Sequence, residues 1–89
     1  MTESPNLGEL ARTNLLRRIE DVLDSDVRAG LAADGGGVEL AGIDADNIVQ
    51  VRLLGACQGC SSSLYTLTMG IERALKVRIP EIRFVEAVP

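Results

Sequence analysis

The sequence contains no histidine, no tryptophan and only two aromatic residues, Tyr65 and Phe84. Without imidazole, Ser-His-Asp and Cys-His catalysis, histidine-ligated zinc and histidine-ligated haem are all excluded. Two aromatic residues are too few for a stacking platform on single-stranded nucleic acid. Thirteen acidic residues against nine basic ones leave a net charge of −4, which repels a phosphate backbone. These absences exclude much of ordinary enzyme chemistry, and we predict that the protein has no nucleic-acid partner.

Long apolar runs are also missing, which argues against a membrane span. The first residues, Met1–Asn6, are polar and carry Glu3 where a secretory signal has basic residues. We therefore expect a cytoplasmic protein with no membrane contact. Cytosolic thiols stay reduced, and Cys57 and Cys60 are too close in sequence to brace a fold through a long loop. A structural disulfide is thus disfavoured.

The length and composition indicate a single compact domain. The chain has 89 residues, of which 46% are hydrophobic and 25% are charged, the values of an ordinary globular domain. We predict a flexible N-terminus over residues 1–6 and one domain over residues 7–89.

The hydrophobic pattern of the first half predicts a helix followed by a β-hairpin. Apolar residues at three- and four-residue spacing over residues 15–31 predict an amphipathic helix, which Asp26 divides in two and the glycines at 35–37 end. Residues 38–43 and 48–54 are β-rich and flank a cluster of turn-forming residues, so they predict the hairpin.

The second half predicts a helix and a strand. A serine hydroxyl from residues 61–63 is expected to cap the helix, and Pro80 ends it. The strand is expected over residues 82–88, with Ile82 and Phe84 on one face. Helix, hairpin, helix and strand in this order predict an α+β fold, in which helices pack on one face of a three-stranded mixed sheet.

The segment GACQGCS, residues 55–61, places a CxxC pair between the predicted hairpin and the second helix. Two intervening residues let the sulfurs of Cys57 and Cys60 point at one centre, and a helix N-terminus stabilises thiolates. The spacing leaves three interpretations open: ligation of a metal or cluster, thiol redox chemistry, and inert packed cysteines. Redox motifs favour a thioredoxin-like βαβ context, and inert cysteines favour an apolar stripe, so ligation suits this Gly/Ser-rich loop best.

One chain alone does not offer enough ligands for a metal ion or cluster. A closed zinc site or an iron–sulfur cluster usually takes four protein ligands, whereas the chain offers two thiolates. A two-fold symmetric dimer would bring two CxxC pairs together, so that four thiolates hold one centre at the interface. Two functions outside cluster chemistry remain as alternatives. One is a thiol-disulfide oxidoreductase with Cys57 as nucleophile and Cys60 as resolving thiol, and the other is a structural zinc-bridged dimer.

Two motifs carry a family resemblance. One is LAADGGGVEL, residues 31–40, an aspartate-glycine turn that enters a strand. The other is VRLLGACQGCSSS, residues 51–63, followed by TMGIERAL at residues 68–75. In this order, over roughly residues 14–88, the chain resembles the NifU C-terminal-domain (Nfu) family of iron–sulfur cluster scaffolds and carriers. Ser61 and Ala29 stand where that family commonly has proline.

The resemblance implies a non-enzymatic protein that binds a labile 4Fe-4S cluster between two chains and transfers it to apo-proteins. Cys57 and Cys60 match the cluster ligands of the family, although two CxxC pairs could also hold a 2Fe-2S centre. The implied partners are the cluster assembly machinery as donor, apo iron–sulfur proteins as recipients, and a second copy of the chain when the cluster is bound.

Other conspicuous residues are expected to be structural. The turn at Asp34 lacks the GK[ST] ending of a phosphate-binding loop, so it should simply end the first helix, although Asp34 could approach the CxxC loop. Arg12, Arg17 and Arg18 are interspersed with acidic residues and should form a solvated helix face.

Four apolar residues follow the second cysteine on the predicted helix. We expect Leu64 and Tyr65 to form a hydrophobic shoulder around a dimeric cluster, and Leu67 and Met69 to lie in the core.

Overall fold

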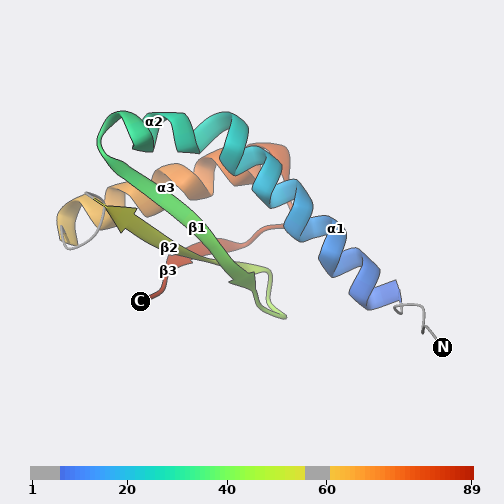
Figure 1. Ribbon diagram of the computed structural model, residues 1–89. Coiled ribbons are helices and arrows are strands. Elements are labelled where there is room, and N and C mark those ends of the chain that lie inside the picture. Colours follow the sequence, from blue (N-terminus) through green and yellow to red (C-terminus); the bar gives the residue numbers. More distant parts are fainter. Residues whose placement is uncertain (1–6, 56–60) are drawn as a thin grey trace.

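The computed structural model describes residues 7–55 and 61–89 of the chain (Figure 1). The elements follow one another in the predicted order: α1 (Leu7–Val22), η1 (Leu23–Val27), α2 (Arg28–Ala33), β1 (Gly36–Ile43), β2 (Ile48–Gly55), α3 (Ser61–Arg78) and β3 (Phe84–Ala87). The predicted N-terminal segment, residues 1–6, lies outside the described residues.

The first helical segment is continuous but changes its winding in the middle. A π turn, η1, spans Asp26, and the Arg28 N–H closes it by donating to the carbonyl of Leu23. A π turn inserts an extra residue into the helical ladder and rotates the faces that follow. This turn therefore joins α1 to α2 at the place where the sequence predicts a division.

The sheet has the strand order β1-β2-β3 (Figure 1). Strands β1 and β2 pair antiparallel as the predicted hairpin, whereas β2 and β3 pair parallel, with Val49 opposite Val85. The mixed three-stranded sheet is thus confirmed. The antiparallel register shifts between Leu40 and Gly42, which leaves Ala41 as a β-bulge in the edge strand.

The core lies between the helices and one face of the sheet. Alternate residues of β2 are buried, which is the pattern of a strand with one covered face. Figure 1 shows the helical segments on that side of the sheet. The buried hydrophobic side chains are Ile19, Val22, Leu23, Leu31, Val38, Ile43, Val49, Val51, Leu53, Ile71, Leu75, Ile79, Ile82 and Val85. The predicted α+β fold is therefore confirmed.

The prediction of which residues of the third strand face the core is wrong in one respect. Ile82 is buried as expected, but Phe84 is 51% exposed and Val85 is the buried residue. The cause is a turn after α3, in which the Ile82 N–H donates to the carbonyl of Ile79. Because the strand begins only at Phe84, its alternation starts anew and does not continue from Ile82. The Phe84 ring instead lies beneath the ammonium of Lys76, 5.3 Å from the ring centroid.

Met69 is a second correction. Leu67 is partly buried against the core, as predicted, but Met69 is 44% exposed. The buried residues of α3 are Ile71 and Leu75, and Leu67 lies one turn before Ile71 on the same face. Met69 is two residues away from both Leu67 and Ile71, which places it on the opposite side of the helix, where it faces solvent.

Candidate functional site

The CxxC pair falls in the one internal stretch outside the described residues, so the site is defined by what flanks it. Gly55 ends β2, the central strand, and Ser61 begins α3. Cys57 and Cys60 both lie in the sequence between these two ends. The predicted position of the pair, between the hairpin and the second helix, is confirmed, whereas their role as ligands stays a prediction. The side chains of residues 61–63, and with them the predicted helix cap, are also outside the described part.

Both anchors of the CxxC segment are joined to the core. In β2, Leu53 is buried two residues before the strand ends. In α3, Ile71 and Leu75 are buried against the sheet. The segment therefore connects two elements that the hydrophobic core holds in fixed relative positions.

The end of β2 packs closely against the turn between α2 and β1. Gly36 pairs with Gly55 across the hairpin, and Gly55 has a positive φ of 63°. A Cβ at Gly55 would lie 2.5 Å from the carbonyl oxygen of Gly35, a distance that real Cβ atoms do not adopt. Glycine is therefore required at position 55 both by its backbone conformation and by this contact.

The turn itself is a helix C-terminus, as the sequence predicts. Asp34 is the C-cap of α2, and its N–H donates to the carbonyl of Leu31 at 3.0 Å. Gly35 follows with φ 77° and donates its N–H to the carbonyl of Ala32. This left-handed glycine is a common helix ending. Gly35, the residue after Asp34, is the part of the turn that meets the end of β2.

Arg28 connects this turn to β1 and is a residue that the sequence analysis did not single out. Its guanidinium donates to the carbonyl oxygen of Val38 from Nε and Nη2, at 3.3 and 3.2 Å. It also pairs with Glu20 at 2.9 Å and Asp24 at 2.6 Å. Burial alone would lower the pKa of Arg28, but the hydrogen bonds that it donates to the carboxylates of Glu20 and Asp24 outweigh burial and raise the pKa. Arg28 is therefore a permanent cation that holds the start of β1 against the helices.

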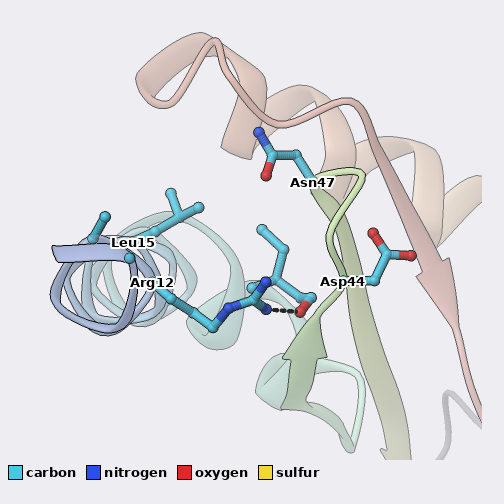
Figure 2. A pocket seen from close by; sticks show the side chains of 7 residues that line it. Arg12, Leu15, Asp44 and Asn47 are labelled. Atoms are coloured by element: carbon cyan, nitrogen blue, oxygen red, sulfur yellow. Dashed lines mark hydrogen bonds between the residues drawn. The ribbon is translucent and has the colours of Figure 1, made fainter. Parts of the chain in front are cut away.

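The helix arginines are exposed, as predicted. Arg18 pairs with Glu81 at 3.0 Å. Arg12 donates to the carbonyl of Ile43 beside a small hollow of about 200 Å³ between α1 and the β1–β2 turn (Figure 2). In Figure 2 the Arg12 side chain crosses this hollow from the helix to the strand end. Asn47, with φ 62°, closes the same turn by donating its backbone N–H to the carbonyl of Asp44, and its side-chain amide donates to the carbonyl of Glu81. These residues anchor elements to one another and form no recognisable reaction centre.

Exposed apolar side chains flank the CxxC segment on both sides. Leu54 is 37% exposed just before it, and Tyr65 and Met69 are 69% and 44% exposed on α3. Tyr65 and Met69 are four residues apart and share one helix face. The exposure of Tyr65 agrees with the predicted shoulder, while the side chain of Leu64 lies outside the described residues.

Within the described part of the chain, no group of three or more His, Cys, Asp or Glu side chains is placed to hold a metal ion. None of the helices described combines the length and hydrophobicity that crossing a membrane requires.

Comparison with known proteins agrees with the motifs and the fold. The family model of the NifU-like domain matches residues 19–86. The chain is 55% identical over 71 residues to NifU-like protein 2, chloroplastic, from Arabidopsis thaliana, covering 80% of this chain and 29% of that protein. It is 46% identical over 74 residues to the Fe/S biogenesis protein NfuA of Vesicomyosocius okutanii, covering 83% of this chain and 38% of that protein.

A human protein is similar over nearly the whole chain. The chain is 38% identical over 87 residues to the NFU1 iron-sulfur cluster scaffold homolog, mitochondrial, from Homo sapiens, covering 98% of this chain and 34% of that protein. The chain thus spans between 29% and 38% of the length of these three relatives. The family match includes the Asp34 turn, both flanks of the CxxC segment and β3 as far as Glu86. The chain belongs to the NifU-like domain family, the family that its motifs resemble.

Proposed function

We propose that this chain is a non-enzymatic iron–sulfur cluster scaffold or carrier, which holds a labile 4Fe-4S cluster between two copies through Cys57 and Cys60. The observation that carries the proposal is the family match together with the names of two relatives, one an Fe/S biogenesis protein and the other an iron–sulfur cluster scaffold homolog. Both names describe handling of clusters and not conversion of a small molecule.

The number of available ligands supports a cluster that is shared between two copies of the chain. The chain has two cysteines and no histidine. A 4Fe-4S cluster takes four cysteine thiolates. Two copies related by a two-fold axis supply four thiolates, two from each CxxC pair.

The position of the pair also supports binding of an anionic centre. The segment runs into the first residue of α3, an 18-residue helix. The N-terminus of a helix carries a partial positive charge and unpaired N–H groups, which stabilise thiolates and the negative charge of a thiolate-bound cluster. The exposed Tyr65 and Met69 on the same helix offer apolar surface for the second copy.

Transfer then follows by ligand exchange. A cysteine thiol of the recipient loses its proton and forms an iron–thiolate bond, and the bond from Cys57 or Cys60 to the same iron breaks. The released thiolate takes up a proton, so bonds and charges balance and no electron is transferred. The donor in this scheme is the cluster assembly machinery, and the recipients are apo iron–sulfur proteins.

Native mass spectrometry after anaerobic reconstitution with iron and sulfide tests the proposal. The expected result is a peak of two chains plus one 4Fe-4S unit in the wild type, which is absent from Cys57→Ala and Cys60→Ala. Urea unfolding of each variant is the control that the fold is kept. A cluster retained by Cys57→Ala contradicts the ligand assignment. A bare monomer, a monomer with an internal disulfide, or a zinc-bridged dimer contradicts cluster carriage and favours redox or structural chemistry.

A further inference from the structure

Strand β1 is an edge strand of the sheet, with β2 as its neighbour. The carbonyl oxygen of Val38 accepts two hydrogen bonds from Arg28 in the helical layer, so it points away from β2. Backbone groups two residues apart in a strand point to the same side. Leu40 therefore also directs its N–H and its carbonyl oxygen away from β2. Within the described part of the chain, neither of these groups has a hydrogen-bond partner at this edge.

Two arginines close the edge on both sides of Leu40. Arg28 covers the carbonyl two residues before it, and Arg12 donates from α1 to the carbonyl of Ile43 at the end of the strand (Figure 2). The β-bulge at Ala41 interrupts the regular strand between them. Charged side chains and bulges are the means by which edge strands avoid pairing with other chains. The edge is thus left open at a single pairing position, that of Leu40.

A groove of about 410 Å³ lies beside this open position, between α1 and β1. Its volume is in the range of about 300–1,000 Å³ that is usual for ligand sites. Strand β1 contributes residues 40–42 to it, and the lining residues from α1 are Thr13, Leu16, Arg17 and Glu20. The α1 residues are three and four positions apart, so a single helix face forms one wall. Extended peptides bind at sheet edges by adding a strand, and neighbouring hollows then receive alternate side chains.

The groove carries a positive charge that is not balanced within the described residues. Arg17 is exposed and forms no ion pair with any residue that the structure describes. Glu20, the acidic residue of the lining, is already paired with Arg28 at 2.9 Å. Leu16 and Leu40 pack against the core but are only partly buried, so they offer apolar surface beside the free cation. The groove therefore favours a segment that combines an apolar side chain with a carboxylate.

We propose that this groove binds an extended segment of a partner protein, in which an apolar residue and an acidic residue are two positions apart. The apolar residue pairs antiparallel with Leu40: its N–H donates to the Leu40 carbonyl, and its own carbonyl accepts from the Leu40 N–H. Residues that face each other across two strands share one face of the sheet, so its side chain lies on the helix side, with that of Leu16. The acidic residue points to the same side, because side chains alternate along a strand, and it pairs with Arg17. The interaction uses neither cysteine and goes beyond the proposed function.

The same features disfavour a second copy of the chain as the occupant. A two-fold pair of β1 strands brings identical patches together. The charge of Arg17 would then face the same cation of the other copy and not a carboxylate. The bulge at Ala41 and the two covering arginines also interrupt a long ladder between strands. A short extended segment needs only the position of Leu40.

The probe for the test is the acetylated and amidated heptapeptide Thr-Glu-Thr-Leu-Thr-Glu-Thr. It carries a glutamate two positions from the leucine on either side, so one of them points toward Arg17 in the proposed pairing. NMR titration of the isotope-labelled protein gives the Kd and follows the amide signals of Leu40 and Gly42. Hydrogen exchange of the Leu40 N–H is measured with and without the peptide.

Two altered peptides and two protein variants separate the contributions. A peptide with N-methyl-leucine lacks the N–H that pairs with the carbonyl of Leu40, and a second peptide has lysine in place of both glutamates. Arg17→Glu reverses the charge in the groove. Arg73→Glu is the matched control, since Arg73 is exposed on α3 and likewise forms no ion pair with a described residue.

We expect the glutamate peptide to shift the amide signals of Leu40 and Gly42 and to slow exchange of the Leu40 N–H. N-methylation should weaken binding at least about ten-fold, because the carbonyl of Leu40 loses its donor. Arg17→Glu should weaken binding of the glutamate peptide about ten-fold and strengthen binding of the lysine peptide, whereas Arg73→Glu should stay within about two-fold of wild type.

Four results overturn the proposal. Unchanged signals of Leu40 at millimolar peptide exclude binding at this edge, and equal binding of the N-methylated peptide excludes strand pairing. Equal binding of the glutamate and lysine peptides by the wild type excludes the role of Arg17. Exchange at Leu40 that slows with rising protein concentration, without peptide, shows that a second copy covers the edge. The peptide series requires no change in the protein, so it decides the matter even if Arg17→Glu does not fold.

Discussion

The carboxylate of Glu72 on α3 accepts a hydrogen bond of 3.0 Å from the backbone N–H of Val85 on β3. Strand β3 is an edge strand, so its outer N–H groups have no neighbouring strand to bond with. Exposed strand edges invite pairing with another chain. Glu72 covers this edge from the helix layer, as Arg28 covers the opposite edge by binding the carbonyl of Val38 on β1.

We expect Glu72→Ala to lower the free energy of unfolding by about 1–2 kcal/mol, because the Val85 N–H loses its acceptor. Glu72→Gln keeps an acceptor oxygen and should cost less than half as much. The measurement is urea unfolding, with amide hydrogen exchange at Val85 as the local readout. Glu39→Ala is the control, since Glu39 forms an exposed pair with Arg52 and its loss should change stability little. Unchanged exchange at Val85 in Glu72→Ala would contradict this role.

Arg28→Ala should destabilise the protein by about 2–3 kcal/mol, because the carbonyl of Val38 and two carboxylates lose one shared donor. Arg28→Lys should recover only part of this loss, since an ammonium lacks the planar fork that contacts all three groups. Urea unfolding measures both effects. Arg18→Ala is the control, because Arg18 forms an exposed pair with Glu81 and should cost under about 1 kcal/mol. Equal losses in the Ala and Lys variants would count against the geometric argument.

The pH dependence of Glu81 has a defined sign. A hydrogen bond from its own backbone N–H, followed by the Arg18 guanidinium, lowers the pKa of Glu81 from its usual 4.5. A lowered pKa in the folded state means that the stabilisation is present above pH 4.5 and is lost as the pH falls through the lowered value. Arg18→Gln should raise the pKa only partway to 4.5, because the backbone hydrogen bond remains.

An NMR titration of the Glu81 carboxyl carbon measures this shift. Arg17→Gln is the matched control, since Arg17 lies beside Arg18 on α1 and has no ion pair with any residue in the described part of the chain. The control should leave the pKa of Glu81 where it is in the wild type. A full return to 4.5 in Arg18→Gln would assign the whole effect to Arg18.

Gly70→Ala should raise the free energy of unfolding by about 0.5–1 kcal/mol. Gly70 lies inside α3, and a Cβ there would meet no atom within 4 Å. Alanine reduces the conformational entropy of the unfolded chain and favours the helix. Thermal or urea unfolding checks the gain, and Gly55→Ala should change stability in the opposite direction. A loss of stability in Gly70→Ala would show that α3 needs flexibility at this point.

Much of the fold could be predicted from local patterns. The helical spacing over residues 15–31 and the alternation in β2 indicate which face of each element is apolar, and burial follows from that face. The turn-forming residues around Asp44 indicate where the hairpin reverses. The strand after α3 was harder, because Ile82 lies in a turn that restarts the alternation at Phe84. Met69 was misplaced because an isolated apolar residue on a helix does not reveal which side the sheet covers.

For the candidate site, too, some features follow from the sequence and others only from the tertiary structure. The sequence by itself determined which ligands the chain can offer, two thiols and no imidazole, and also the CxxC spacing and the family motifs. These features depend only on which residues are present and in what order. Only the tertiary structure decided that Gly55 meets the carbonyl of Gly35 and that Arg28 reaches Val38. Gly35 and Gly55 are twenty residues apart in sequence, and they meet because antiparallel pairing of β1 with β2 folds the chain back on itself.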